Sequence, residues 1–135
     1  MIDGKPNFKT APIVLSTGER GYKKCHMNHP CSKWLRTSLT SYRWLAALGL
    51  ELLREYEYRY CGKIHSCGDH IQWLASHYPK NLEDFGWVEP FLAMPDEYKS
   101  GDPVASYRRY YKYDKKERGF LKYTKRNVPH WLNED

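Results

Sequence analysis

Long hydrophobic runs are missing from this sequence of 135 residues. The longest strongly apolar stretch, residues 44–50, is far shorter than the roughly 20 residues that a transmembrane helix needs. The N-terminal residues also lack the pattern of a secretory signal peptide. We therefore expect a cytoplasmic protein with no membrane partner, in a compartment where its four cysteines stay reduced.

Linker segments are missing as well, so no composition shift divides the chain. A length of 135 residues fits one domain, whose core needs no disulfide. Residues 1–24 combine Gly, Pro, Lys and Thr around one apolar patch, which predicts a loop-like N-terminal arm. We expect a single helical domain over residues 1–135, and the sequence does not indicate its oligomeric state.

Helical periodicity is strongest over residues 31–60. Apolar and aromatic residues recur there at steps of three and four, which forms one stripe on a helix. The stripe consists of Leu35, Leu39, Tyr42, Leu45, Gly49, Leu52, Tyr56 and Tyr60. Pro30 fits the first turn of this helix, and Gly62 follows its end.

Two shorter helices are predicted further along the chain. One covers residues 69–77 and ends before Pro79. The other covers residues 103–117, with Asp102 as N-cap and Gly119 as the stop. The expected fold class is therefore all-α, a compact helical domain with a long central helix.

Positive charge gathers near the C-terminus. The whole chain has a net charge of +6, whereas residues 98–126 hold ten basic and three acidic residues, a net charge of +7. Arg108, Lys112 and Lys115 share one helical face, and Lys125 and Arg126 follow. Tyrosines are interleaved with these cations at positions 107, 110, 111 and 113. Cations beside rings are typical of nucleic-acid binding. The alternative is a solvated helix whose tyrosines pack inward.

The motif Cys-x3-His-x-Cys occurs twice, at residues 25–31 and 61–67. Thiolates and imidazoles suit zinc, but neither copy has the usual Cys-x2-Cys spacing. A straight helix of thirty residues would also separate the copies by about 45 Å. We therefore expect no metal and no other cofactor. The alternative to a metal site is buried thiols with histidines that cap helix ends.

Several runs along the chain carry a family resemblance. They are His29-Pro30-x3-Trp34-x3-Ser38-x3-Tyr42-x-Trp44-Leu45, Glu55-Tyr56-x-Tyr58-Arg59-Tyr60, Ala93-Met94-Pro95-Asp96-Glu97-Tyr98-Lys99, Asp102-x2-Ala105-x-Tyr107-Arg108-x-Tyr110-Tyr111 and Lys125-Arg126-x2-Pro129-x-Trp131. Across about residues 26–131 the chain resembles a family of small phage proteins, which in turn resembles the pyrimidine-dimer DNA glycosylases. The resemblance implies a glycosylase-like helical fold, a place in the cytoplasm of an infected cell, and DNA as substrate.

Those glycosylases attack the sugar with an N-terminal α-amine, assisted by a glutamate of their first helix. Here the bulky Ile2 normally leaves Met1 in place, and Glu19 lies in a turn between two glycines. No residue is therefore assigned a catalytic role. We expect a binder of a nucleotide or DNA. The alternatives are an active DNA glycosylase with AP lyase activity in base-excision repair, and sequestration of a nucleotide signal of host antiphage defence.

The predicted ligand site combines rings for a base with guanidinium groups for a phosphate. Its residues are His29, Trp34, Tyr42, Arg43, Arg59, Tyr107, Arg108 and Tyr111. His29 is included because it precedes the first turn of a helix, where backbone N–H groups favour anions. The alternative for Trp34 and Tyr42 is a place in the core, since aromatic residues at helical spacing are usually buried.

Overall fold

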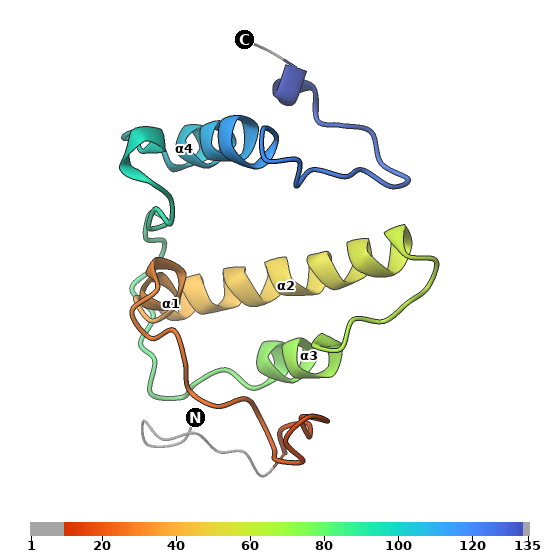
Figure 1. The fold of residues 1–135 in the computed structure, drawn as a ribbon. Helices are drawn as coiled ribbons and strands as arrows, with labels where there is room; N and C mark the ends of the chain where they lie inside the picture. Colours follow the sequence, from red (N-terminus) through yellow and green to blue (C-terminus); the bar gives the residue numbers. More distant parts are fainter. Residues whose placement is uncertain (1–9, 134–135) are drawn as a thin grey trace. The chain divides into compact units, whose positions relative to one another are not determined.

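The computed structural model describes residues 10–133, and its chain divides into two compact units. Unit 1, Met1–Val88, contains α1 (Pro30–Leu35), α2 (Leu39–Arg59) and α3 (Gly68–Ser76). Unit 2, Glu89–Asp135, contains η1 (Asp96–Tyr98), α4 (Pro103–Tyr110), η2 (Tyr111–Lys115) and η3 (His130–Asn133). Figure 1 shows these elements along the chain.

The regular secondary structure of the described residues is helical, and the prediction of an all-α fold is confirmed. No strand forms within residues 10–133, where a single antiparallel bridge joins Ile13 to Arg20 in the N-terminal arm. Residues 1–9 of that arm lie outside the described part of the chain. The glycosylase-like fold and the single domain over residues 1–135 stay predictions. No helix of the described residues combines the length and the hydrophobicity that crossing a membrane requires.

The predicted continuous helix over residues 31–60 is wrong at one point, because α1 ends at Leu35 and α2 begins at Leu39. The Thr37 hydroxyl donates to the Trp34 carbonyl at 2.6 Å, at the end of α1. Ser38 is extended, with φ −164° and ψ 152°, and its hydroxyl accepts from Thr40 N–H at 3.3 Å. Ser38 is thus the N-cap of α2. Its side chain hydrogen-bonds to the backbone in place of the bonds that a continued helix would make.

Asp84 fastens a distant loop to the start of α2. One carboxylate oxygen accepts from the Thr40 hydroxyl at 2.7 Å, the Ser38 hydroxyl at 2.9 Å and Gly86 N–H at 3.0 Å. These hydrogen bonds, that from the Thr40 side chain foremost, lower the pKa of Asp84 from 3.8 to about 2. A carboxylate at a helix N-terminus also satisfies free N–H groups there. The loop before Val88 is therefore held by the same residues that interrupt the helix.

Close packing joins α2 to α3. A Cβ atom added at Gly49 would lie 3.0 Å from a methyl carbon of Ile71, so the small residue lets the two helices approach. The Tyr42 hydroxyl donates to the Leu74 carbonyl at 2.6 Å, and burial raises the pKa of Tyr42. The bounds of α3 differ by one residue at each end from the predicted 69–77, which confirms that helix.

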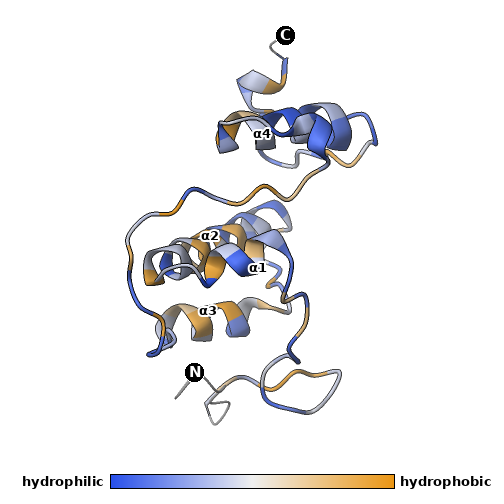
Figure 2. Ribbon diagram, turned by 90° about the vertical axis from the view of Figure 1, so that its left-hand side faces the viewer, coloured by the Kyte–Doolittle hydropathy of each residue, from blue (hydrophilic) through white to orange (hydrophobic). Residues whose placement is uncertain are grey.

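Unit 2 is built around α4 and its continuation. Asp102 caps α4 as predicted, since its carboxylate accepts from Val104 N–H at 3.0 Å. Beyond Tyr110 the helix widens to the π form of η2, where Lys116 N–H donates to Tyr111 five residues back at 3.1 Å. The helical path therefore ends near the predicted residue 117, but its second half is not α-helical. Figure 2 colours the ribbon by residue hydropathy and shows hydrophilic residues in the helical segment of unit 2.

Candidate functional site

Trp34 and Tyr42 lie in the core of unit 1, with 3% and 8% of their surfaces exposed. The Trp34 indole donates to the Val88 carbonyl at 2.8 Å. It also makes edge contacts with Trp44 and Trp87, each with ring centres 5.6 Å apart. A ring that stacks on a base needs an open face. In this packing neither Trp34 nor Tyr42 has an open ring face. Their positions agree with the alternative that both side chains belong to the core.

His29 is the N-cap of α1, and its Nδ1 accepts from Cys31 N–H at 3.1 Å. That contact already uses one of the N–H groups that were expected to favour an anion. Since α1 has only six residues, the reason for placing a phosphate at His29 does not hold. His29 instead confirms the expectation of a histidine that caps a helix.

The two arginines predicted from unit 1 both contact neighbours within that unit. The exposed Arg43 lies with its guanidinium 5.1 Å from the centre of the Tyr78 ring. Arg59 donates through Nε to Glu55 at 2.9 Å, and the two side chains are 26% and 30% exposed. Glu55 and Arg59 therefore form an i, i+4 ion pair on α2.

Among the predicted residues of unit 2, Tyr107 and Tyr111 make hydrogen bonds that order the segments around the helix. The Tyr107 hydroxyl donates to Phe91 C=O at 2.8 Å and accepts from Ala93 N–H at 3.2 Å. The Tyr111 hydroxyl lies 2.7 Å from that of Tyr123. The tyrosines interleaved with the basic residues thus hold loops onto the helical segment.

The cations of the helical segment lie over aromatic rings of the same unit. Arg108 is 5.1 Å from the centre of the Trp131 ring, and Lys112 is 5.4 Å from that of Tyr113. Lys115 lies 5.0 Å from the Tyr110 ring. Such contacts are worth about 0.5–1 kcal/mol at exposed positions. They orient the cations without neutralising them.

Carboxylates play a small part in holding this basic segment. In unit 2 the ion pairs between described residues join Lys99 to Asp96 and Arg118 to Asp114. Within residues 10–133 no ion pair is formed by three of the ring-bound cations of unit 2, Arg108, Lys112 and Lys115, whereas Arg118, which lies over the Phe120 ring, pairs with Asp114. A cation on a ring keeps its full charge for a phosphate, whereas a cation beside a carboxylate does not.

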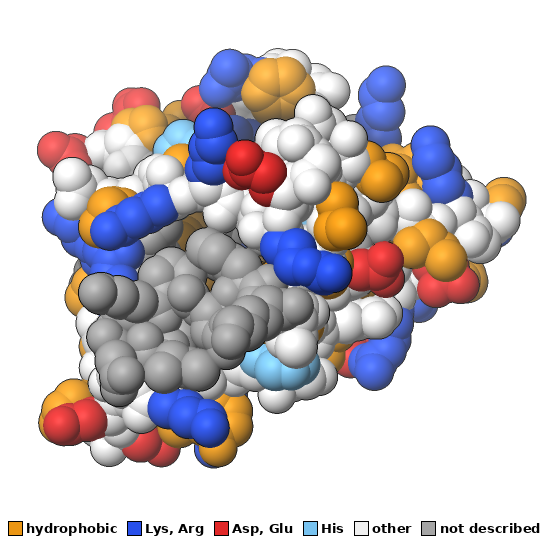
Figure 3. All heavy atoms as spheres, turned by 90° about the horizontal axis from the view of Figure 1, so that it is seen from below, with side chains coloured by type: hydrophobic (Ala, Val, Ile, Leu, Met, Phe, Trp, Pro, Cys, Tyr) orange, Lys and Arg blue, Asp and Glu red, His pale blue; other side chains and the backbone are white. Residues whose placement is uncertain are grey.

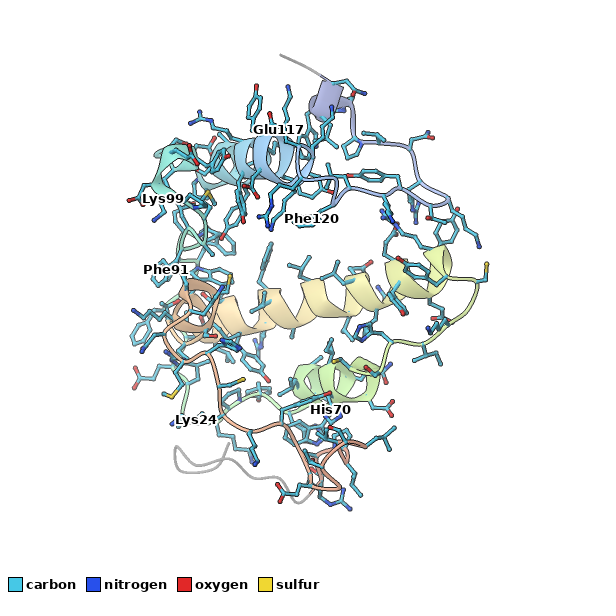
Figure 4. The ribbon with its side chains drawn as sticks, in the orientation of Figure 1. Lys24, His70, Phe91, Lys99, Glu117 and Phe120 are labelled. Atoms are coloured by element: carbon cyan, nitrogen blue, oxygen red, sulfur yellow. The ribbon has the colours of Figure 1, made fainter. Side chains whose placement is uncertain are left out.

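The end of the helical segment brings a further aromatic residue beside the cations. Gly119 has φ +72°, which suits glycine, and its N–H donates to Lys116 C=O at 3.0 Å. Phe120 N–H donates to Lys115 C=O, also at 3.0 Å. This pair of hydrogen bonds defines a Schellman motif, so the predicted stop at Gly119 is confirmed. Figure 4 labels Phe120 at this position.

Lys125 and Arg126, the last two predicted phosphate contacts, lie in the exposed loop after this motif. Lys125 has φ +62°, a left-handed conformation that is uncommon for a side chain other than glycine. The two groups of predicted site residues, one in unit 1 and one in unit 2, thus have different surroundings. The first is largely packed or paired, whereas in the second Arg108, Lys125 and Arg126 are exposed and Lys112 and Lys115 are half-buried.

The two Cys-x3-His-x-Cys copies share one local hydrogen bond. His65 Nδ1 accepts from Cys67 N–H at 3.0 Å, as His29 does with Cys31. In the neutral ring the proton then lies on Nε2. The expectation of buried thiols is wrong, because Cys25 and Cys61 are exposed. Within residues 10–133 no group of three or more His, Cys, Asp or Glu is arranged to hold a metal ion.

Sequence reasoning missed Phe120, Trp131 and Asp84 as residues that shape these surroundings. Phe120 had a usable signal, because an apolar residue after a C-terminal glycine is the usual partner in a Schellman motif. Asp84 and Trp131 carried none, since each acts on residues far away along the chain.

On the face drawn in Figure 3, basic, acidic and apolar side chains are intermixed.

Comparisons with family models, curated proteins and solved structures found no match for this chain.

Proposed function

We propose that this protein binds a nucleic acid or nucleotide through the basic, aromatic surface of α4 and η2. The observation that carries the proposal is the set of ring-bound cations, Arg108, Lys112 and Lys115, which make no ion pair with a described residue. Phosphates are the ligands that such cations suit best. The resemblance to a phage protein family related to the pyrimidine-dimer glycosylases points to the same class of ligand, nucleic acids and nucleotides. We therefore include that relationship in the proposal.

Ordering of the cations supports binding rather than general solubility. A long basic side chain that is free in solution loses rotamer freedom when it grips a phosphate, at a cost of about 0.5–1.5 kcal/mol. Arg108 against Trp131 and Lys115 against Tyr110 have already lost part of that freedom. The guanidinium of Arg108 can also grip a phosphate with two parallel hydrogen bonds, which an ammonium cannot.

The alternative of a DNA glycosylase with AP lyase activity depends on an amine nucleophile. Met1, whose α-amine would have that role, lies outside the described residues. Borohydride treatment of the protein with abasic duplex DNA distinguishes the two functions, because it would trap an imine as a covalent adduct. A binder leaves no adduct, whereas an adduct would establish the enzyme and identify its nucleophile.

The test of the proposal is the salt dependence of DNA binding, measured by fluorescence anisotropy. The double variant Arg108→Gln with Lys112→Gln keeps most of each side chain and removes two charges. If both residues contact phosphates of a duplex, the slope of log affinity against log salt should fall in magnitude by about 1.8, since each phosphate contributes about 0.9.

The matched control is Lys63→Gln with Lys80→Gln, which removes the same charge from exposed positions of unit 1. This control should leave the slope nearly unchanged. Equal effects of the two double variants would contradict the proposal, because binding would then reflect net charge alone. A ligand that binds with little salt dependence and raises the melting temperature would instead indicate a small nucleotide in an enclosed site.

A further inference from the structure

Phe120 is an exposed ring in a fixed position. The Schellman motif sets the backbone at Gly119 and Phe120, so the ring folds back toward the last helical turn. The Phe120 residue is nevertheless 57% exposed. In the usual Schellman motif the residue at this position covers apolar side chains of the preceding turn. Here the residue whose carbonyl accepts from Phe120 N–H, and which the ring would cover, is Lys115. The ring therefore lies beside a charged side chain and not an apolar one.

Two cations lie over this ring. The Arg118 guanidinium carbon lies 4.7 Å from the centre of the Phe120 ring, and Lys115 Nζ lies 5.5 Å from it. Arg118 also pairs with Asp114 at 3.3 Å, so Lys115 is the one of the two that makes no ion pair with a described residue. An exposed phenylalanine by itself is common on protein surfaces and needs no explanation. An exposed ring with a fixed backbone and the charge of Lys115 beside it matches the elements of single-strand recognition, where bases stack on rings, arginine contributes cation–π contacts and phosphates contact cations.

We infer that Phe120 is a stacking platform for an unpaired base, and that the ligand of unit 2 is therefore single-stranded nucleic acid. The inference rests on the proposed function, because it assumes that the neighbouring cations contact phosphates. A duplex keeps its bases stacked on one another inside the helix, so a ring at the protein surface gains little from it. An unpaired strand presents the face of each base to such a ring.

The experiment compares Phe120→Leu with Phe120→Trp. Leucine keeps the apolar contact of the Schellman motif but has no aromatic face, whereas tryptophan offers a larger one. With a single-stranded DNA or RNA oligonucleotide, Phe120→Leu should weaken binding about fivefold or more, the lower end of what one base–aromatic stack contributes. Phe120→Trp should bind at least as tightly as the wild type. Neither substitution should change binding to a duplex of the same length.

Phe85→Leu is the matched control, because Phe85 is a still more exposed phenylalanine (71%) in unit 1. It should leave single-strand binding unchanged. Thermal melting of each variant shows whether the fold is retained. If Phe120→Leu does not fold, the comparison of Phe120→Trp with the wild type still decides. In that case, weaker single-strand binding by Phe120→Trp, or equal gains for single strand and duplex, overturns the inference.

The inference and the proposed function fail in different ways. Salt-dependent binding in which duplex and single strand are equal, or in which Phe120→Leu has no effect, overturns the inference and keeps the function. Absence of salt-dependent binding to any oligonucleotide overturns the inference and the nucleic-acid part of the proposed function, which leaves only a nucleotide as ligand. Vesicles of phosphatidylcholine and phosphatidylserine are included because a ring beside cations also suits an anionic membrane surface. Phe120-dependent binding to those vesicles, without binding to a single strand, a duplex or a nucleotide, overturns both.

Discussion

Contacts between rings predominate in unit 1, where Arg43 also lies over the Tyr78 ring, and contacts between rings and cations predominate in unit 2, which also holds two ring–ring pairs. In unit 1 the rings pack against one another, as when Trp44 and Trp87 approach to 5.9 Å, and the Trp34 and Tyr42 polar tips donate to backbone carbonyls. In unit 2 the rings of residues 110, 113, 120 and 131 lie against lysine and arginine side chains. Aromatic content by itself therefore does not identify a binding surface. What distinguishes one is the contact that each ring makes.

Burial follows the same division. Unit 1 buries Trp34 and Tyr42 together with a serine-rich helix start, whereas the buried residues of unit 2, among those described, are Ser106 and Leu132. A unit with so few buried apolar side chains gains little stability from hydrophobic burial. Its order depends more on caps, such as that of Asp102, and on contacts between rings and cations. We expect mutations in the two units to have correspondingly different effects.

The largest expected effect is that of Trp34→Ala. It removes a side chain that is almost fully buried between two other tryptophans, so it should lower the free energy of unfolding by roughly 3–5 kcal/mol, measured by urea denaturation. Trp87→Ala, at a residue that is 49% exposed, is the control and should cost clearly less. Unchanged stability together with lost nucleic-acid binding would place the ligand at Trp34 and contradict the division between the units.

A smaller effect is expected in acid. The pKa of Asp84 is about 2 in the folded state, below its ordinary value of 3.8, because Thr40, Gly86 and Ser38 donate hydrogen bonds to the carboxylate. A lowered pKa means that the charged form stabilises the fold. This contribution is complete above pH 3.8 and is lost as the pH falls toward about 2.

Urea denaturation of the wild type and of Asp84→Asn, at several pH values between about 5 and 2, measures this loss. The difference in stability between the two proteins should shrink as the pH falls. Glu57→Gln, at an exposed position of α2, is the control and should show no such trend. A difference that stays constant over the range would show that the Asp84 carboxylate does not fasten the loop to α2.

Local chemistry made part of this fold predictable from sequence. The start and the end of the helical segment formed by α4 and η2 were predictable, because each depends on residues that are close along the chain. Asp102 precedes a proline at the start, and Gly119 follows a basic turn at the end. The interruption before Leu39 was not, because the N-cap at Ser38 is held by Asp84, which lies 46 residues further on. Helical periodicity continues across the break and conceals it.

For the candidate site, the sequence predicted the types of residue but not their contacts. The sequence indicates the basic residues and the rings of residues 98–126, but not which ring each cation contacts. Arg108 lies over Trp131, a contact between residues 23 positions apart, and the widened turn of η2 has no sequence signal of the kind that a cap provides. The same limit explains why Trp34 was a candidate for stacking and Phe120 was not. Burial is decided by tertiary packing, which periodicity does not reveal.

We expect the ligand to contact unit 2 and not the core of unit 1. This can be tested by titrating an isotope-labelled sample with a single-stranded oligonucleotide and following the amide chemical shifts in NMR spectra. The largest shift changes should fall on α4, η2 and the Gly119–Phe120 turn. Largest changes around Trp34, Tyr42 and α3, with unit 2 little affected, would contradict this expectation.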